Sequence, residues 1–201
     1  MSGHAAIERM TVEAFLDWAT RRPEGERWEL VEGEPVPVRG PTPAHAMAAE
    51  TVTHARIKRR IDHALGAALA NGGHDCEMFV SGPKVQIDPT TAFEPDVAVS
   101  WAEVPEGLLV PEPLIVVEIL SPSTRDKDFT IKLAGYAALP SVAHYRLIDT
   151  QRRLVVHHHR STGETDFRTS IVRGGLLRLD PPGLDLDLNA IYAGSGIWSD
   201  C

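Results

Sequence analysis

Two acidic residues in strand-like segments are the first candidates for chemistry in this sequence. Asp96 opens the run Asp96–Ser100, and Glu118 interrupts the apolar run Leu114–Leu120. An ionised carboxylate inside a hydrophobic run is costly unless it is paired or binds a metal. If the two runs are neighbouring strands, Asp96 and Glu118 converge, and with a backbone carbonyl they offer the hard oxygen ligands that Mg²⁺ prefers. The sequence therefore predicts a Mg²⁺ site, with Mn²⁺ as a substitute, that activates water against a phosphodiester. The alternative for Glu118 is a buried carboxylate bonded to a structural arginine.

Lys132 is the candidate third part of this site. It lies in a predicted helix, Thr124–Leu139, beside Leu133 and Tyr136. From there its ammonium group could reach over the sheet edge to orient the attacking water or stabilise phosphoryl oxygens. The alternative is that Asp128 and Lys132 form an ordinary surface ion pair four residues apart on the helix.

A histidine and a group of basic residues occupy the helical pattern from about His45 to Ala70. His54 stands at the start of its apolar stripe and could face the metal or the scissile phosphate; His45 is the alternative if the helix starts earlier. The densest basic cluster follows and either touches phosphate or forms a solvated helix face. It consists of Arg56, Lys58, Arg59 and Arg60.

Other metal-binding patterns are weaker. Adjacent residues of a strand point to opposite faces, so His157, His158 and His159 cannot converge on one ion, and a solvated or partly buried strand is expected. Cys76 and Cys201 lack the spacing of a zinc site.

Composition limits the function classes. The chain has 201 residues, with 20 Lys and Arg against 28 Asp and Glu, and a net charge of −8. This charge excludes a polybasic nucleic-acid binder but not a nuclease with a local basic patch. Acidic residues interrupt any secretory signal, two cysteines give no disulfide framework, and no run spans a bilayer. We therefore expect a cytoplasmic protein without a membrane partner.

The pattern of elements predicts an α/β (α+β) fold with a mixed sheet flanked by helices. We expect a single domain over residues 1–201, with its core at 11–192 and a short tail at 193–201. The expected elements are a helix after Thr11, a hairpin at 28–36, helices at 45–70 and 124–139, strands at 76–81, 84–87, 96–100, 114–120, 143–148, 154–159 and 165–172, and a closing turn or short helix at 185–192.

Five segments, in this order, carry a family resemblance. They are Trp28–Glu34, Pro95–Ala98, Val117–Thr124, Lys132 with Tyr136, and His144–Asp149. No segment is specific alone, but together they resemble the Uma-two family of restriction endonucleases, a branch of the PD-(D/E)XK nuclease superfamily. The resemblance extends over most of the chain, from about residue 11 to residue 192.

The resemblance implies a restriction-endonuclease-like core and Mg²⁺-dependent phosphodiester hydrolysis. It makes Asp96 and Glu118 metal ligands, with Ile119 supplying the backbone carbonyl. In the wider superfamily a lysine lies two residues after the second acid, where this chain has Leu120. Lys132 instead matches the migrated lysine of this branch.

Two further residues match the family pattern. Glu29 corresponds to an acidic position and could lie near the metal, or be an exposed hairpin carboxylate. His54 resembles the histidine that opens the family's helix.

The expected function is therefore that of a Mg²⁺-dependent endodeoxyribonuclease. Two alternatives remain open: an inactive nuclease-fold binding or scaffold protein, and a metal-dependent phosphodiesterase that acts on a substrate other than DNA. A homodimer is expected because two sites cut two strands more easily than one. The net charge of −8 weakens the case for DNA more than the case for the fold.

Overall fold

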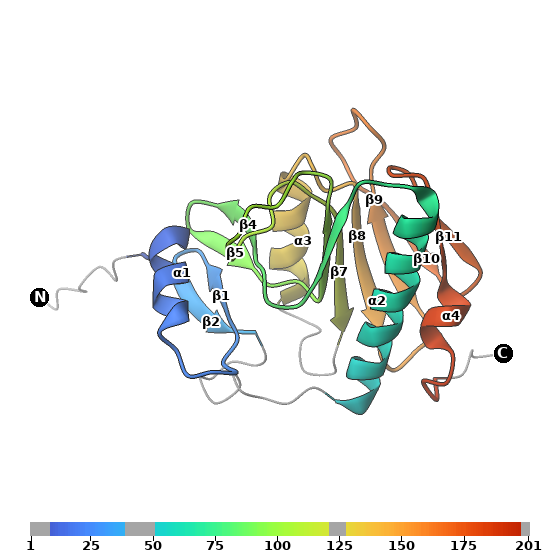
Figure 1. Cartoon of the computed structure of the whole chain (residues 1–201), viewed down its shortest axis with the longest axis horizontal. Coiled ribbons are helices and arrows are strands. Elements are labelled where there is room, and N and C mark those ends of the chain that lie inside the picture. The colour runs from blue at the N-terminus through green and yellow to red at the C-terminus, as the bar shows by residue number, and fades with distance from the viewer. Residues whose placement is uncertain (1–8, 39–50, 121–127, 198–201) are drawn as a thin grey trace, which may run out of the picture.

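A computed structural model describes residues 9–38, 51–120 and 128–197, and its central element is a large mixed β-sheet (Figure 1). The strand order is β10-β9-β8-β7-β6-β3; β7 and β8 are parallel and the other neighbours are antiparallel. The strands are β3 (Glu77–Val80), β6 (Val97–Ser100), β7 (Pro113–Leu120), β8 (His144–Asp149), β9 (Val155–His159) and β10 (Arg168–Val172).

A smaller antiparallel sheet with order β2-β1-β5-β4 lies beside the first. Its strands are β1 (Trp28–Val31), β2 (Glu34–Pro37), β4 (Val85–Asp88) and β5 (Thr91–Phe93). Helix α1 (Val12–Thr20) packs on it through Phe15, which is fully buried with Leu30. Thr11 caps α1 by accepting a hydrogen bond from the Ala14 N–H at 3.2 Å. The predicted first helix and hairpin are confirmed.

Helix α2 (Val52–Gly72) begins where a cap is available. The Thr51 hydroxyl accepts a hydrogen bond from the backbone N–H of His54 at 3.2 Å, and Gly73 ends the helix with φ of +63°. The predicted start near residue 45 differs from this boundary, and His45 itself lies outside the described residues.

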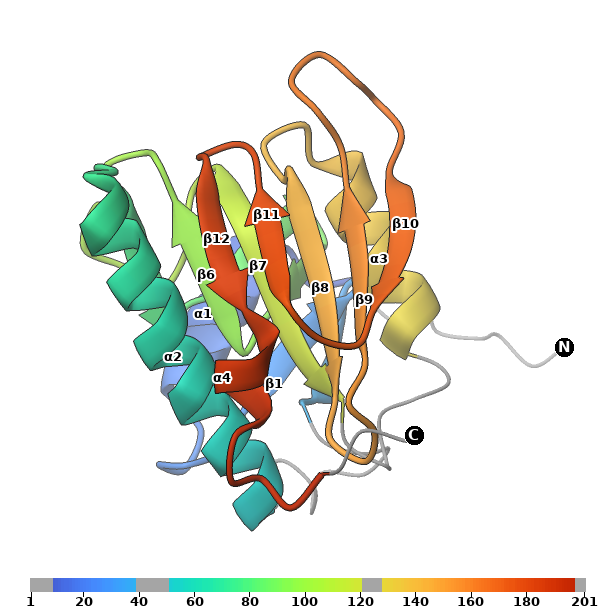
Figure 2. The same cartoon turned by 90° about the vertical axis from the view of Figure 1, so that its right-hand side faces the viewer.

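Each face of the large sheet has its own cover. Helix α2, the hairpin β11 (Leu176–Leu179) and β12 (Leu184–Asp187), and helix α4 (Leu188–Tyr192) cover one face (Figure 2). Helix α3 (Asp128–Ala138) and the small sheet cover the other. Apolar residues of β7 pack into both cores, as predicted for a central strand.

The structure contains details that were not predicted. These are the short strands β5, β11 and β12, and the two smaller antiparallel sheets beside the large mixed sheet. The closing turn or short helix expected at 185–192 is confirmed in part, because its end is helix α4 but its first residues belong to β12, whose leucines are buried. In the described parts of the chain, no helix combines the length and apolarity needed to cross a membrane.

Candidate active site

Strands β6 and β7 bring the two predicted acids to the same end of the large sheet. They are antiparallel neighbours with Val97 opposite Val117, so Asp96 and Glu118 lie one residue beyond this pair. The backbone N–H of Ile119 donates to Asp96 Oδ2 at 2.8 Å. A backbone donor therefore fixes the Asp96 carboxylate against the strand that carries Glu118.

Helix α2 supplies the remaining partners of Asp96. His54 Nε2 lies 3.3 Å and Lys58 Nζ 2.8 Å from Oδ1 of this carboxylate. Lys58 also donates to Ser81 Oγ at 3.0 Å. His54 and Lys58 are both buried, one helical turn apart, and so share a face of α2. Burial alone would raise the pKa of Asp96, but His54 and Lys58 outweigh it and hold this pKa well below its usual range.

Helix α3, on the opposite face of the sheet, supplies the partners of Glu118. Lys132 Nζ lies 2.9 Å from Oε1, and the Tyr136 hydroxyl donates to the same oxygen at 3.2 Å. Gly135 lets the helix approach this closely, because a Cβ there would lie 2.7 Å from the ring of Phe93. Lys132 thus contacts Glu118, whereas the side chain of Asp128, its alternative partner, lies outside the described part of the chain. No structural arginine is bonded to Glu118 among the described residues.

Glu29 enters the site from the small sheet. Its Oε1 lies 2.8 Å from Lys132 Nζ and accepts a hydrogen bond from the Glu94 N–H at 2.8 Å. The residue is 4% exposed, so the alternative of an exposed hairpin carboxylate is wrong. Lys132 therefore bridges Glu29 and Glu118, which belong to different sheets.

The site holds more negative charge than its lysines neutralise. Burial raises the pKa of Glu118 to about 7; Lys132 lowers it in part, while Asp96 and Glu29 raise it further. For Lys132, burial alone would lower the pKa, but Glu118 and Glu29 raise it well above its ordinary value. One carboxyl of the site thus exchanges its proton near neutral pH while the ammonium group stays charged.

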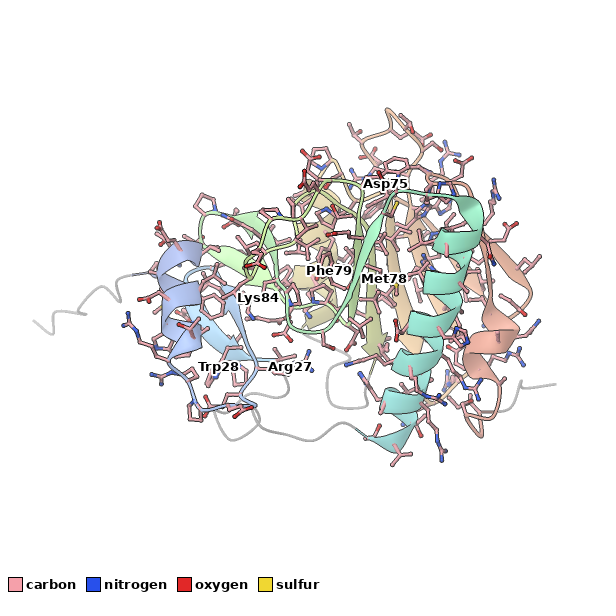
Figure 3. All side chains as sticks on the ribbon, viewed as in Figure 1. Arg27, Trp28, Asp75, Met78, Phe79 and Lys84 are labelled. Carbon is pink, nitrogen blue, oxygen red and sulfur yellow. The ribbon has the colours of Figure 1, made fainter. Side chains whose placement is uncertain are left out.

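A neighbouring acid, Glu94, is occupied by its own cations. Arg27 Nε donates to Oε1 at 2.7 Å, Lys84 Nζ lies 3.2 Å from Oε2, and the Gly82 N–H donates to Oε1 at 3.1 Å. Arg27 and Lys84 lie at the boundary between the small sheet and β3 (Figure 3). Glu94 therefore joins the sheets and is not a free ligand.

The donor set of the site suits a hard divalent cation. Its acidic side chains are Glu29, Asp96 and Glu118, all carboxylates, and burial, with a smaller contribution from Asp96 and Glu29, raises the pKa of Glu118. Among the described residues, no group of three or more His, Cys, Asp and Glu side chains forms a ready metal cage. Mg²⁺ does not require one, because it usually keeps several waters and takes one or two carboxylates.

Sequence reasoning missed the inward position of Lys58. The residues of the basic cluster were expected to lie together on one surface of the helix. Arg56 and Arg59 are exposed, but Lys58 is 8% exposed and contacts Asp96. The signal was present in the spacing, since His54, Lys58 and Ile61 follow the three- and four-residue steps of the buried stripe.

The three consecutive histidines lie on alternate faces, as predicted. The ring of His158 stacks on Tyr145 at 5.7 Å, whereas His157 lies on the other face, bonded to His144. His157 and His158 are buried and His159 is half-buried, so the strand is partly buried, the second of the two expected possibilities, and not solvated. Cys76 is a free thiol, and Cys201 lies outside the described residues.

Known proteins share this architecture. A solved structure described as "a putative nuclease belonging to DUF820", from Anabaena variabilis, superposes with a TM-score of 0.67 at 15% identity, covering 92% of this chain and 98% of that one. Two curated relatives from Synechocystis sp. carry the names "Uncharacterized protein slr1290" and "Uncharacterized protein sll1609". The first is 26% identical over 96% of both chains, and the second is 28% identical over 74% of this chain and 80% of its own.

The likeness to the solved Anabaena variabilis structure shows a restriction-endonuclease-like fold, in which β6 and β7 carry the paired acids. The profile of the Uma2 family, described as "Putative restriction endonuclease", matches residues 12–190. The chain belongs to this family, as its sequence motifs indicated, and this membership supports a nuclease-like function.

Proposed function

We propose that this protein is a Mg²⁺-dependent endonuclease that hydrolyses DNA phosphodiester bonds, with Mn²⁺ as a substitute. The observation that carries the proposal is the buried group of Glu29, Asp96 and Glu118 with two lysines at one end of the sheet. Such a cluster is costly to bury, and a divalent cation would neutralise the negative charge that the two lysines leave.

In this proposal Asp96, Glu118 and the backbone carbonyl of Ile119 hold the metal. The bound ion would activate water and neutralise charge on the phosphodiester. His54 and the Ile119 N–H orient the Asp96 carboxylate, and the Tyr136 hydroxyl orients Glu118.

The two lysines supply fixed positive charge. Lys132, held between Glu29 and Glu118, would orient the attacking water or stabilise the phosphoryl oxygens. Glu29 positions Lys132. This contact fixes the direction of a lysine that lies on helix α3 instead of on strand β7. Lys58 lies on the other side of the acids and would face a second phosphoryl oxygen once a metal takes over its role at Asp96.

A cleavage assay tests the proposal. Purified protein is expected to cut DNA in Mg²⁺ or Mn²⁺ and not in EDTA, and Glu118→Ala is expected to abolish cleavage while circular dichroism shows the chain still folded. Glu106→Gln, at an exposed site away from the acids, is the control and should cut normally. Cleavage that survives Glu118→Ala at the wild-type rate would refute the assignment.

DNA as the substrate draws support from α2. The helix that carries His54 and Lys58 into the site also exposes Arg56 and Arg59, which offer contacts to the phosphate backbone. A homodimer with two such sites would cut both strands, and sedimentation with and without DNA tests that assembly.

The alternative of an inactive scaffold is favoured by one observation. Each proposed ligand carboxylate already has a lysine close by, at 2.8 Å from Asp96 and 2.9 Å from Glu118, so the site is partly neutralised without a metal. Divalent-ion titration followed by thermal melting separates the two: stabilisation by Mg²⁺ or Mn²⁺ that Glu118→Ala removes favours a metal site. A non-DNA phosphodiesterase would cleave a model phosphodiester while leaving DNA intact.

A further inference from the structure

A buried arginine surrounded by histidines lies on the opposite face of the large sheet from Glu118. Arg146 on β8 pairs in register with His157 on β9, and His144 pairs with His159. Side chains two residues apart on a strand share a face, so these four lie together on the face that β11 and β12 cover. The proposed nuclease chemistry uses none of them.

Arg146 has no counter-ion among the described residues. It is 0% exposed, and its Nε, Nη1 and Nη2 atoms are all buried without a hydrogen-bond partner. No carboxylate of the described chain lies within ion-pair distance of it. Burial lowers the pKa of Arg146 to about 9, so the guanidinium is still charged at neutral pH.

The neighbouring histidines bring no negative charge, and the N–H groups of His144 and His157 are already used in hydrogen bonds. His144 Nε2 lies 2.7 Å from the Pro181 carbonyl, an acceptor only, so this nitrogen carries the proton. His144 Nδ1 is then the acceptor in its 2.9 Å hydrogen bond with His157 Nε2. Both rings are neutral at pH 7, since burial and the nearby Arg146 lower the pKa of His144 to about 3 and that of His157 to about 2. His159 Nδ1 is a further buried nitrogen without a partner.

We propose that the Arg146 guanidinium, enclosed by the neutral histidine rings, binds a small inorganic anion of halide size beneath the β11–β12 hairpin. An isolated guanidinium in an apolar core is unfavourable, and water supplies hydrogen bonds but cannot cancel its charge. A monovalent anion supplies both, by accepting from the guanidinium N–H groups and neutralising them. The leucines of β11 and β12 that cover this face exclude solvent and favour a compact ion over a hydrated one.

Thermal melting at constant ionic strength tests the site. Replacing sodium gluconate with sodium chloride or bromide is expected to raise the Tm of the wild-type protein saturably. Arg146→Met should lose this anion-dependent rise, because it keeps the length of the side chain and removes the charge. Arg173→Met, at an exposed arginine, is the matched control and should keep the rise.

A bromide-soaked crystal of the wild-type protein gives a second readout that does not depend on the variant folding. Anomalous density beside the Arg146 guanidinium would support the proposal. An anion-dependent rise that is equal in wild type and Arg146→Met would overturn it, as would a wild-type Tm that is the same in gluconate, chloride and bromide. If Arg146→Met fails to fold, absence of bromide at Arg146 in the wild-type crystal overturns the proposal alone.

Discussion

Replacing Glu118 by glutamine is expected to stabilise the metal-free protein at pH 8, although the residue lies at the centre of the candidate site. Glutamine keeps an oxygen that accepts from the Tyr136 hydroxyl and from Lys132, which retains Glu29 as its ionic partner. What the substitution removes is a buried negative charge close to Asp96 and Glu29.

The magnitude follows from the pKa of Glu118. Its ordinary value is 4.5 and burial raises it to about 7. At about 1.4 kcal/mol for each tenfold change in proton affinity, ionising this buried carboxyl costs the folded state on the order of 3 kcal/mol.

The sign depends on pH. Below about pH 4.5 the carboxyl is protonated in both the folded and the unfolded chain, so it carries no penalty. Between about pH 4.5 and pH 7 the unfolded chain ionises this carboxyl while the folded chain keeps it protonated, so the wild-type protein loses stability across this window and no more above it. Glutamine does not titrate, so the advantage of Glu118→Gln is small at pH 5, grows up to about pH 7 and has its full size at pH 8.

Urea unfolding in EDTA at pH 5, 6, 7 and 8 measures this difference, with Glu106→Gln at an exposed position as the control. The control should unfold like the wild type at every pH. The reasoning would be refuted if the Glu118→Gln protein were less stable than the wild type at pH 8. It would also be refuted if the two proteins differed in unfolding free energy by the same amount at pH 5 and at pH 8.

Three further predictions concern the surroundings of the site. Lys58→Met should cost about 3–5 kcal/mol of unfolding free energy, because it leaves a buried carboxylate without its closest cation. Urea titration measures the loss, and a loss no larger than that caused by replacing a surface lysine would contradict the prediction. Changing Arg56 and Arg59 together to glutamine should flatten the dependence of log K for DNA on log salt by about 0.9 for each phosphate that the variant no longer neutralises, measured by fluorescence anisotropy; an unchanged slope would exclude both from the interface. Arg160→Met should destabilise the protein by on the order of 3 kcal/mol or more, because Arg160 donates to the carbonyls of Ala137 and Leu139 at the end of α3 and to those of Val142 and Thr165; a thermal melt at the wild-type temperature would show that these bonds contribute little.

The sequence predicted the acids better than the framework that surrounds them. Glu118 was conspicuous because a charge within an apolar run violates the pattern of a buried strand, and the same argument pointed to a partner. Lys132 was a candidate from its place in the helix after Glu118, but its local spacing equally suits a surface ion pair, and the family resemblance favoured the site. The contact of Glu29 with Lys132 joins residues 103 positions apart (132 − 29) and has no local signature.

The short elements were beyond pattern reasoning for a physical reason. Strand β5 has three residues, all buried, so it offers no alternation to detect. Strands β11 and β12 do alternate, but each has four residues, and the intervening Pro181 and Gly183 resembled a loop. The burial of Arg146 could not be predicted from the neighbouring residues either, because it depends on a hairpin that is distant in sequence.

The bridge that Lys132 makes between Glu29 and Glu118 spreads the framework of the candidate site over two sheets. The large sheet by itself supplies one of the two anchors of this ammonium group, and the small sheet supplies the other. A change in the β1 hairpin that never touches Asp96 or Glu118 would therefore redirect Lys132, so the site can be disabled from a distance by substitutions in the amino-terminal part of the chain that no inspection of the acids would reveal.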